Sequence, residues 1–231
     1  GNGVAENPLS SLTVTTPDYT TANGISSFSD FTLGSECLPP VITTQPTDQT
    51  GCELNSSIPF LVDVTPIDGE SFTYSWQVNT GSGWTTISNG GDYSNATTAT
   101  LTITNPTLSM NGYDYRVVVQ RDCGESVTSS AANLTVNPQP QGSLTGESNL
   151  CKGTTGYLTW TATAGTGPFT IVYNAGSGNL TVTGVISGVP FSVGSLNAST
   201  TFNLVSVADA NCTRTTGFTT GSADITVNPF V

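Results

Sequence analysis

Apolar and polar side chains alternate along short stretches in the first half of the chain. Apolar residues take every second position in Phe60–Val64, Phe72–Val78, Leu101–Ile103 and Tyr115–Val119. A period of two sends successive side chains to opposite faces of a β-strand, so that one face is buried and the other meets water. Short strands of this kind, separated by turn residues, predict a sandwich of two antiparallel sheets.

The second half of the chain follows the same pattern. Apolar residues alternate in Leu158–Ala162, Phe169–Tyr173 and Leu180–Val182, and Phe202–Val207 is a late strand. Trp160, at the centre of the first of these stretches, is a candidate core residue. No window has helical periodicity, and no run approaches the ~18 consecutive apolar residues that a transmembrane helix needs. We therefore expect an all-β chain that does not span a membrane.

One motif occurs twice and divides the chain into units. The stretch Asn133–Pro138 recurs as Asp224–Pro229, and each copy predicts a final strand that ends at proline, which cannot donate to a sheet. The repeat length of about ninety to a hundred residues is the size of one immunoglobulin-like sandwich. We therefore expect tandem immunoglobulin-like antiparallel β-sandwiches at residues 39–138 and 139–231.

Residues 1–38 belong to neither unit. They contain one predicted strand, Ile25–Leu33, after an Asn-Gly turn. A lone hairpin is only marginally stable. We expect this segment to be the last hairpin of a preceding domain, to pair with another subunit, or to pack on the first sandwich.

The chain has 5 cysteines and no histidine, so a zinc site is a poor interpretation. Disulfides are the better one, and they indicate an oxidising, extracytoplasmic compartment. The repeat matches Cys52 with Cys151 and Cys123 with Cys212. We therefore expect the pairs Cys52–Cys123 and Cys151–Cys212. Cys37 is then left over, either free, bonded to a missing partner or cross-linking two subunits.

Charge and residue chemistry argue against nucleic-acid binding and against an enzyme. The formal net charge is -12, from 4 Lys+Arg and 16 Asp+Glu, so phosphate backbones are repelled. Without histidine the commonest general base is missing, and no GxSxG nucleophile motif occurs. Paired carboxylates for glycoside hydrolysis stay open, although thin repeated sandwiches seldom form a deep cleft. We expect no enzymatic activity and no cofactor.

Two kinds of side chain are candidates for ligand contact. Trp84 and Tyr93 lie near predicted turns and could stack on sugars, but such aromatics more often cover the edge of a core. Five aspartates supply oxygens that suit calcium: Asp48, Asp63, Asp68, Asp92 and Asp114. Because their spacing matches no EF-hand loop, the favoured interpretation is scattered solvated carboxylates, and no metal site is expected.

A series of sequence blocks runs through nearly all of the first unit. The blocks are Tyr74–Val78, Gly83–Thr85, Ile87–Gly91, Asp92–Ser94, Thr97–Thr104 and Met110–Val117. In order and spacing they resemble the immunoglobulin-like and PKD-like repeats of large surface adhesins from Bacteroidetes. The second unit resembles the same class more loosely, through its cysteines and its closing strand.

The resemblance implies roles for several core residues. Trp76 would be the core tryptophan of an immunoglobulin domain and Tyr115 its corner tyrosine. Val62 and Val117 would occupy the places where antibody domains carry their inter-sheet cysteines. The cysteines of the first unit lie elsewhere, Cys52 before one strand and Cys123 after another, so its disulfide would pin the edge of the sandwich and would not cross its core.

The resemblance also implies a function. Adhesins of this class are typically exported by the type IX secretion system, so we expect a secreted, cell-surface protein with an adhesive or filament-forming role. The expected partners are other copies or domains of the same surface protein, host or substratum glycans and proteins, and the secretion machinery during export. Many weak contacts would be multiplied along rigid repeated sandwiches. Two alternatives stay open: accessory spacer or carbohydrate-binding modules of a secreted enzyme, and a cargo segment bound to its type IX translocon.

Overall fold

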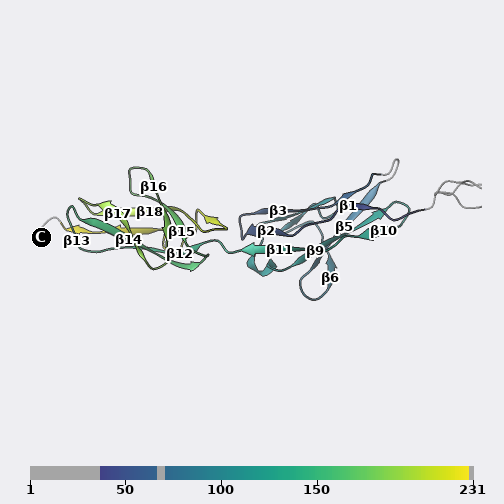
Figure 1. Cartoon of the computed structure of the whole chain (residues 1–231), viewed down its shortest axis with the longest axis horizontal. Helices are drawn as coiled ribbons and strands as arrows, with labels where there is room; N and C mark the ends of the chain where they lie inside the picture. Colours follow the sequence, from purple (N-terminus) through teal and green to yellow (C-terminus); the bar gives the residue numbers. More distant parts are fainter. Residues whose placement is uncertain (1–36, 67–70, 229–231) are drawn as a thin grey trace, which may run out of the picture.

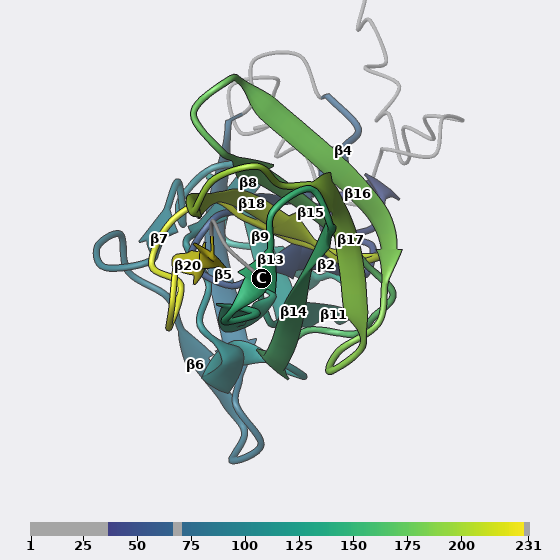
Figure 2. The ribbon, with the colours of Figure 1, turned by 90° about the vertical axis from the view of Figure 1, so that its left-hand side faces the viewer.

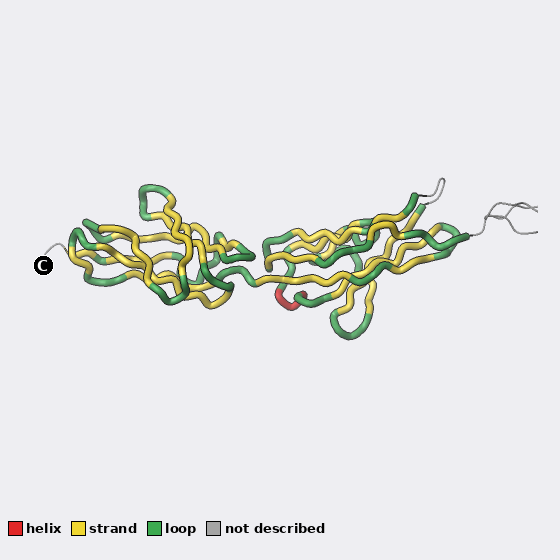
Figure 3. Tube along the Cα trace, viewed as in Figure 1, coloured by secondary structure: helices red, strands yellow, loops and turns green. Residues whose placement is uncertain are grey.

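A computed structural model describes residues 37–66 and 71–228 of the chain. Residues 1–36 of the expected N-terminal segment, and Asp68, lie outside the described residues. The elements in the described ranges are strands and one turn of 3-10 helix, η2 (Leu108–Met110), as Figure 3 shows. The predicted all-β fold is confirmed: the chain is a tandem of immunoglobulin-like, mainly antiparallel β-sandwiches.

The strands of the first sandwich form two layers. They are β1 (Ile42–Thr44), β2 (Gln49–Cys52), β3 (Ser57–Leu61), β4 (Asp63–Val64), β5 (Phe72–Asn79), β6 (Trp84–Thr86), β7 (Tyr93–Ser94), β8 (Thr100–Thr104), β9 (Asp114–Arg121), β10 (Ser126–Thr128) and β11 (Ala132–Asn137). The larger sheet has the order β2-β11-β9-β5-β6, with β10 also paired to β9. The smaller sheet has the order β3-β8-β7, and β1 pairs with β4.

The second sandwich is built in the same way. Its strands are β12 (Gln141–Gly146), β13 (Leu150–Cys151), β14 (Thr155–Ala164), β15 (Phe169–Asn174), β16 (Asn179–Val185), β17 (Pro190–Ser195), β18 (Thr200–Ala208), β19 (Thr213–Arg214), β20 (Ser222–Ile225) and β21 (Val227–Asn228). One sheet has the order β12-β14-β17, and the other has β16-β15-β18-β19 with β20 on β18. A short pair, β13-β21, closes the far end.

Alternating burial along the strands produces two separate cores. β3 and β9 bury every second side chain, as the period of two predicted. Trp76 and Tyr115 are fully buried in the first core, where the Tyr115 ring stacks 4.8 Å from that of Phe60. Trp160 is fully buried in the second core, with its ring edge-on to Phe169. Each sandwich therefore has its own hydrophobic core.

The two sandwiches follow one another along the long axis of the molecule (Figure 1). β2 and β11 of the first sandwich reach the junction, and β13 lies at the opposite end of the second sandwich. Two hairpins stand out from the body (Figures 1 and 2): the β15–β16 hairpin on one side and the β5–β6 hairpin on the other. The described part of the chain is therefore a rod of two sandwiches with a junction between them.

Candidate functional site

The cysteines are paired differently from the expectation. Disulfides join Cys37 to Cys123 and Cys52 to Cys212, and Cys151 is free and exposed. The expected pairs Cys52–Cys123 and Cys151–Cys212 were therefore wrong, and Cys37 is bonded within the chain. The Cys52–Cys212 bond spans 160 residues and joins the two sandwiches covalently.

Strand length explains why the pairs within each unit do not form. Cys52 lies beyond the N-terminal end of β9, whereas Cys123 comes two residues after the C-terminal end of this strand. The strand has 8 residues and spans about 26 Å at 3.3 Å per residue, while a disulfide needs Cα atoms within about 7 Å. Likewise, Cys151 and Cys212 lie beyond opposite ends of the 9-residue strand β18. Each unit thus carries its two cysteines at opposite ends.

Around the interdomain disulfide, the first sandwich contributes Glu53. Its backbone N–H donates to the Asn137 carbonyl, which continues the parallel pairing of β2 with β11. Gln139 of the connector donates its backbone N–H to Glu53 Oε1 at 3.0 Å and its side-chain amide to the Glu53 carbonyl at 2.9 Å. Only 8% of Gln139 is exposed, so the connector is held against the first sandwich by buried hydrogen bonds.

The second sandwich contributes Arg214. Its Nε donates to the carbonyl of Pro140 in the connector at 2.7 Å. One of its terminal nitrogens lies 4.0 Å from Glu53 Oε1, and both side chains are only 16% exposed. A carboxylate from one sandwich and a guanidinium from the other therefore face each other across the connector, where burial strengthens their attraction.

A turn of the second sandwich presents Cys212 to this junction. The Asp209 carboxylate accepts hydrogen bonds from the backbone N–H groups of Asn211 and Cys212, at 2.8 Å and 2.7 Å. Its other oxygen accepts the Thr166 N–H at 2.9 Å. Aspartate stabilises tight turns by accepting from the backbone that follows it. Asp209 thus fixes the turn in which Cys212 reaches Cys52.

The other end of the first sandwich has a similar arrangement. Cys123 sits in the turn between β9 and β10 and bonds to Cys37, which precedes the sandwich. Arg121, only 9% exposed, donates to the Leu38 carbonyl at 2.6 Å, as Arg214 donates to Pro140. In both sandwiches a turn cysteine and a nearby arginine hold the stretch of chain that leads into the sandwich.

The two aromatic candidates for ligand contact have partners within the protein. The guanidinium carbon of Arg116 lies 4.1 Å from the centroid of the Trp84 ring, which is a cation–π contact. The Tyr93 hydroxyl lies 3.2 Å from that of Tyr115, and burial raises the pKa of both phenols. One ring face of Trp84 is therefore covered, and Tyr93 is packed against the first core.

Four of the aspartates considered for calcium lie in the described parts of the first sandwich: Asp48, Asp63, Asp92 and Asp114. Asp48 accepts the Asn133 backbone N–H at 2.7 Å, and Asp114 accepts the Asn133 side-chain amide at 2.9 Å. Among residues 37–66 and 71–228, no group of three or more His, Cys, Asp or Glu is placed to hold a metal ion. These two aspartates thus fix the edge where β11 begins.

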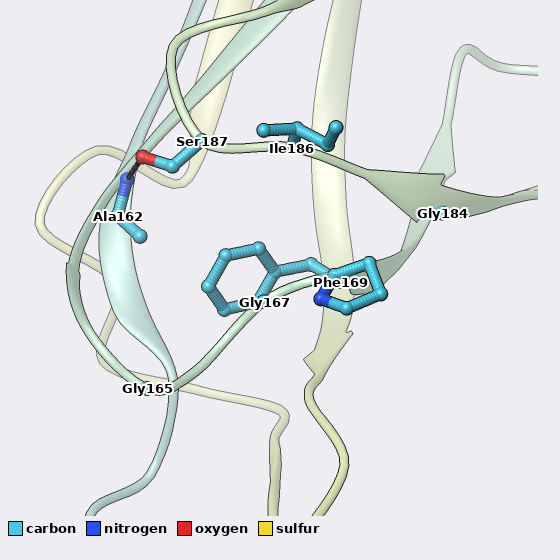
Figure 4. A pocket seen from close by; sticks show the side chains of 8 residues that line it. Ala162, Gly165, Gly167, Phe169, Gly184, Ile186 and Ser187 are labelled. Atoms are coloured by element: carbon cyan, nitrogen blue, oxygen red, sulfur yellow. Dashed lines mark hydrogen bonds between the residues drawn. The ribbon is translucent and has the colours of Figure 1, made fainter.

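A pocket of about 720 Å³ opens on the second sandwich (Figure 4). Its lining is glycine backbone with Pro168, Phe169 and Ile186, and the Ser187 hydroxyl accepts the Ala162 N–H at 3.0 Å. No titratable side chain lines this pocket. The Ser187 hydroxyl in the lining therefore has no titratable side chain beside it there that could act as its general base.

No family model matches the chain, and no curated protein matches it. Among solved structures it is similar to an I-band fragment of titin, with 15% identity, a TM-score of 0.46, and coverage of 83% of this chain and 66% of that one. It is also similar to the first two domains of Rst (15% identity, TM-score 0.39, 84% and 100% covered) and to the N-terminal Ig1-2 module of the Drosophila receptor protein tyrosine phosphatase DLAR (15%, 0.34, 83% and 100%). With TM-scores below 0.5, none of these similarities bears on what this chain binds.

The repeat matches cysteines of equivalent position in the two units and carries no signal for a bond between the units, so it did not predict the junction. The signal that excludes a bond within each unit is the length of the strand before its second cysteine, β9 or β18, because the two cysteines lie beyond opposite ends of that strand. An arginine also lies two residues from each turn cysteine, as Arg121 before Cys123 and Arg214 after Cys212.

Among the residues described here, no helix is long and apolar enough to cross a membrane.

Proposed function

We propose that this chain is a stiff structural or adhesive module of a secreted, cell-surface protein, made of two units at residues 39–138 and 139–231. The observation that carries the proposal is the covalent junction Cys52–Cys212. Neighbouring domains in one chain move relative to each other unless their interface is strong. Here the disulfide and the buried contact between Glu53 and Arg214 hold the two sandwiches in one arrangement.

A fixed junction suits a module that must hold binding surfaces at a distance. Weak contacts add up only when the spacing between them allows simultaneous engagement, and a rod sets that spacing. The two disulfides indicate an oxidising compartment. The resemblance to Bacteroidetes adhesins supports export by the type IX system, and it supports partners among other domains or copies of the same protein, or glycans and proteins of a substratum.

Small-angle X-ray scattering on the intact chain tests the stiffness. We expect one extended arrangement of the two sandwiches for the natural protein. The double variant Cys52→Ser/Cys212→Ser should broaden the distribution of shapes toward bent ones, while Cys151→Ser should change nothing. A natural protein that already populates bent and straight forms equally would contradict the proposal.

Gold-labelled antibodies raised against the chain test the location. Electron microscopy of intact, unpermeabilised cells should show label on structures that extend from the outer surface. Label that appears only after lysis would contradict a surface role and would leave the stiffness result unaffected.

A further inference from the structure

The junction consists of two complementary halves. The outgoing half belongs to the first sandwich: Cys52, Glu53 and the strand end Asn137, where β2 and β11 run parallel. The receiving half is the turn Asp209–Cys212 of the second sandwich, together with Arg214 of β19. A disulfide joins the halves, so the outgoing cysteine of one sandwich bonds to the turn cysteine of the next.

The second sandwich reproduces the outgoing half at its far end. Cys151 pairs with Asn228 in parallel register on β13 and β21, as Cys52 pairs with Asn137 on β2 and β11. In Figure 1, β13 lies at the end of the rod away from the first sandwich. The second unit thus places a cysteine where the first unit places its linking cysteine.

Local backbone conformation supports the equivalence. Two residues after Cys52, Leu54 has a positive φ of 55°, and two residues after Cys151, Gly153 has a φ of 84°. A positive φ is uncommon for leucine and is readily adopted by glycine, so the two loops turn in the same sense at the same offset from the cysteine. Yet Cys52 is bonded, whereas Cys151 is free and exposed.

We propose that Cys151 is the outgoing cysteine for a further immunoglobulin-like domain, one that carries a cysteine on the turn equivalent to Asp209–Cys212. The bonded state of Cys52 in the same position carries this inference. The first sandwich of a second copy is a poor partner, because its turn cysteine Cys123 is already bonded to Cys37. The inference stands whether or not the chain is adhesive.

The charge next to Cys151 predicts which type of residue the partner domain should have near its turn cysteine. Lys152 stands where the first sandwich has Glu53, whose carboxylate faces Arg214 across the junction. A lysine would repel an arginine in that place. The partner should therefore have an acidic or neutral residue at the position equivalent to Arg214.

Bond formation requires an oxidant, and a disulfide compound such as oxidised glutathione supplies it. The partner cysteine first exchanges with glutathione disulfide, which gives a mixed disulfide and releases one glutathione thiol. The Cys151 thiolate then attacks the partner sulfur, forms the interdomain bond and releases the second glutathione as a thiolate, which takes up the proton that Cys151 lost. Two protein thiols are oxidised and one glutathione disulfide is reduced to two thiols.

The test uses the chain carrying Lys152→Glu, extended by a second copy of residues 139–231 joined directly after Pro229. The residue after Cys151 is then a glutamate, like Glu53 after Cys52, and it faces the arginine of the added copy. This join repeats the order Asn-Pro-Gln of the natural connector. After oxidation in a glutathione buffer and alkylation of free thiols, peptide mapping without reduction should find Cys151 bonded to Cys212 of the added copy. The extent should match that of Cys52–Cys212 in the same molecule, which is the internal control.

Two variants sharpen the outcome. Cys151→Ser should leave the added Cys212 alkylated. Restoring the natural Lys152 should slow formation of the new bond about two- to fivefold, the effect of one partly exposed ion pair. An alkylated Cys151 in a molecule whose Cys52–Cys212 bond has formed overturns the proposal.

The natural protein provides a second measurement that does not depend on the added copy folding. Intact cells are alkylated before lysis, and the Cys151 peptide is mapped. We expect it bonded to a cysteine of another immunoglobulin-like domain, and electrophoresis without reduction shows whether that domain lies on the same polypeptide. An alkylated Cys151 on the surface-exposed protein rejects the proposal.

Discussion

Pulling the chain from its two termini measures how the disulfides carry tension. In the oxidised protein the shortest covalent path from Cys37 to Cys212 follows the 15 residues from Cys37 to Cys52 (52 minus 37) and then crosses the interdomain bond. At about 3.3–3.6 Å per residue this path extends to only about 50 Å, even when both sandwiches are unfolded.

Replacing Cys52 and Cys212 by serine sends the tension along another path. It crosses Cys37–Cys123 and then follows the 89 residues from Cys123 to Cys212 (212 minus 123). This path extends to about 300 Å, so the unfolded variant should be about 250 Å longer than the natural protein. Atomic force microscopy on single molecules without reductant, with handles at both termini, gives the contour length directly.

The matched control is Cys37→Ser/Cys123→Ser. It also removes one disulfide, but the short path through Cys52–Cys212 remains, so its contour length should equal that of the natural protein. If the variant lacking Cys52 and Cys212 has the natural contour length, or if the control is longer by a similar amount, the sulfurs are joined in another way and the reasoning fails.

Three further predictions concern stability and assembly. Trp160→Ala should destabilise the second sandwich by about 3–5 kcal/mol, since the side chain is fully buried, and urea denaturation followed by circular dichroism measures this. Asp209→Ala removes the acceptor that shapes the turn of Cys212, so the Cys52–Cys212 bond should form several-fold more slowly in a glutathione buffer; an unchanged rate would show that the turn forms without it. Burial raises the pKa of Tyr93 and Tyr115, and the unfolded phenols lose their protons near pH 10, so the free energy of unfolding should fall as the pH rises above about 10. Denaturant midpoints at pH 8 and pH 11 check this, and Tyr115→Phe should reduce the drop.

The sequence predicted the strands because alternation is a local signal. The stretch Phe72–Val78 became β5, and Tyr115–Val119 lies within β9, with Trp76 and Tyr115 in the core between the layers. Each of these assignments depends only on which face of a strand meets water.

The junction could not be read in the same way, because it depends on which ends of two units meet. The repeat showed that Cys52 and Cys151 are equivalent, but it did not show that equivalent cysteines point away from their own unit. Likewise Glu53, Gln139 and Arg214 are far apart in the sequence, and no spacing rule brings them together.

The overlap of the two disulfide loops has a consequence for cleavage of the backbone. Cys37–Cys123 and Cys52–Cys212 interlock along the sequence, so that one broken peptide bond anywhere between Cys37 and Cys212 leaves two pieces still covalently joined. A chain with each disulfide confined to its own unit would fall apart after one cut in the connector. A protease in the surrounding medium could thus nick this protein once without shedding either half.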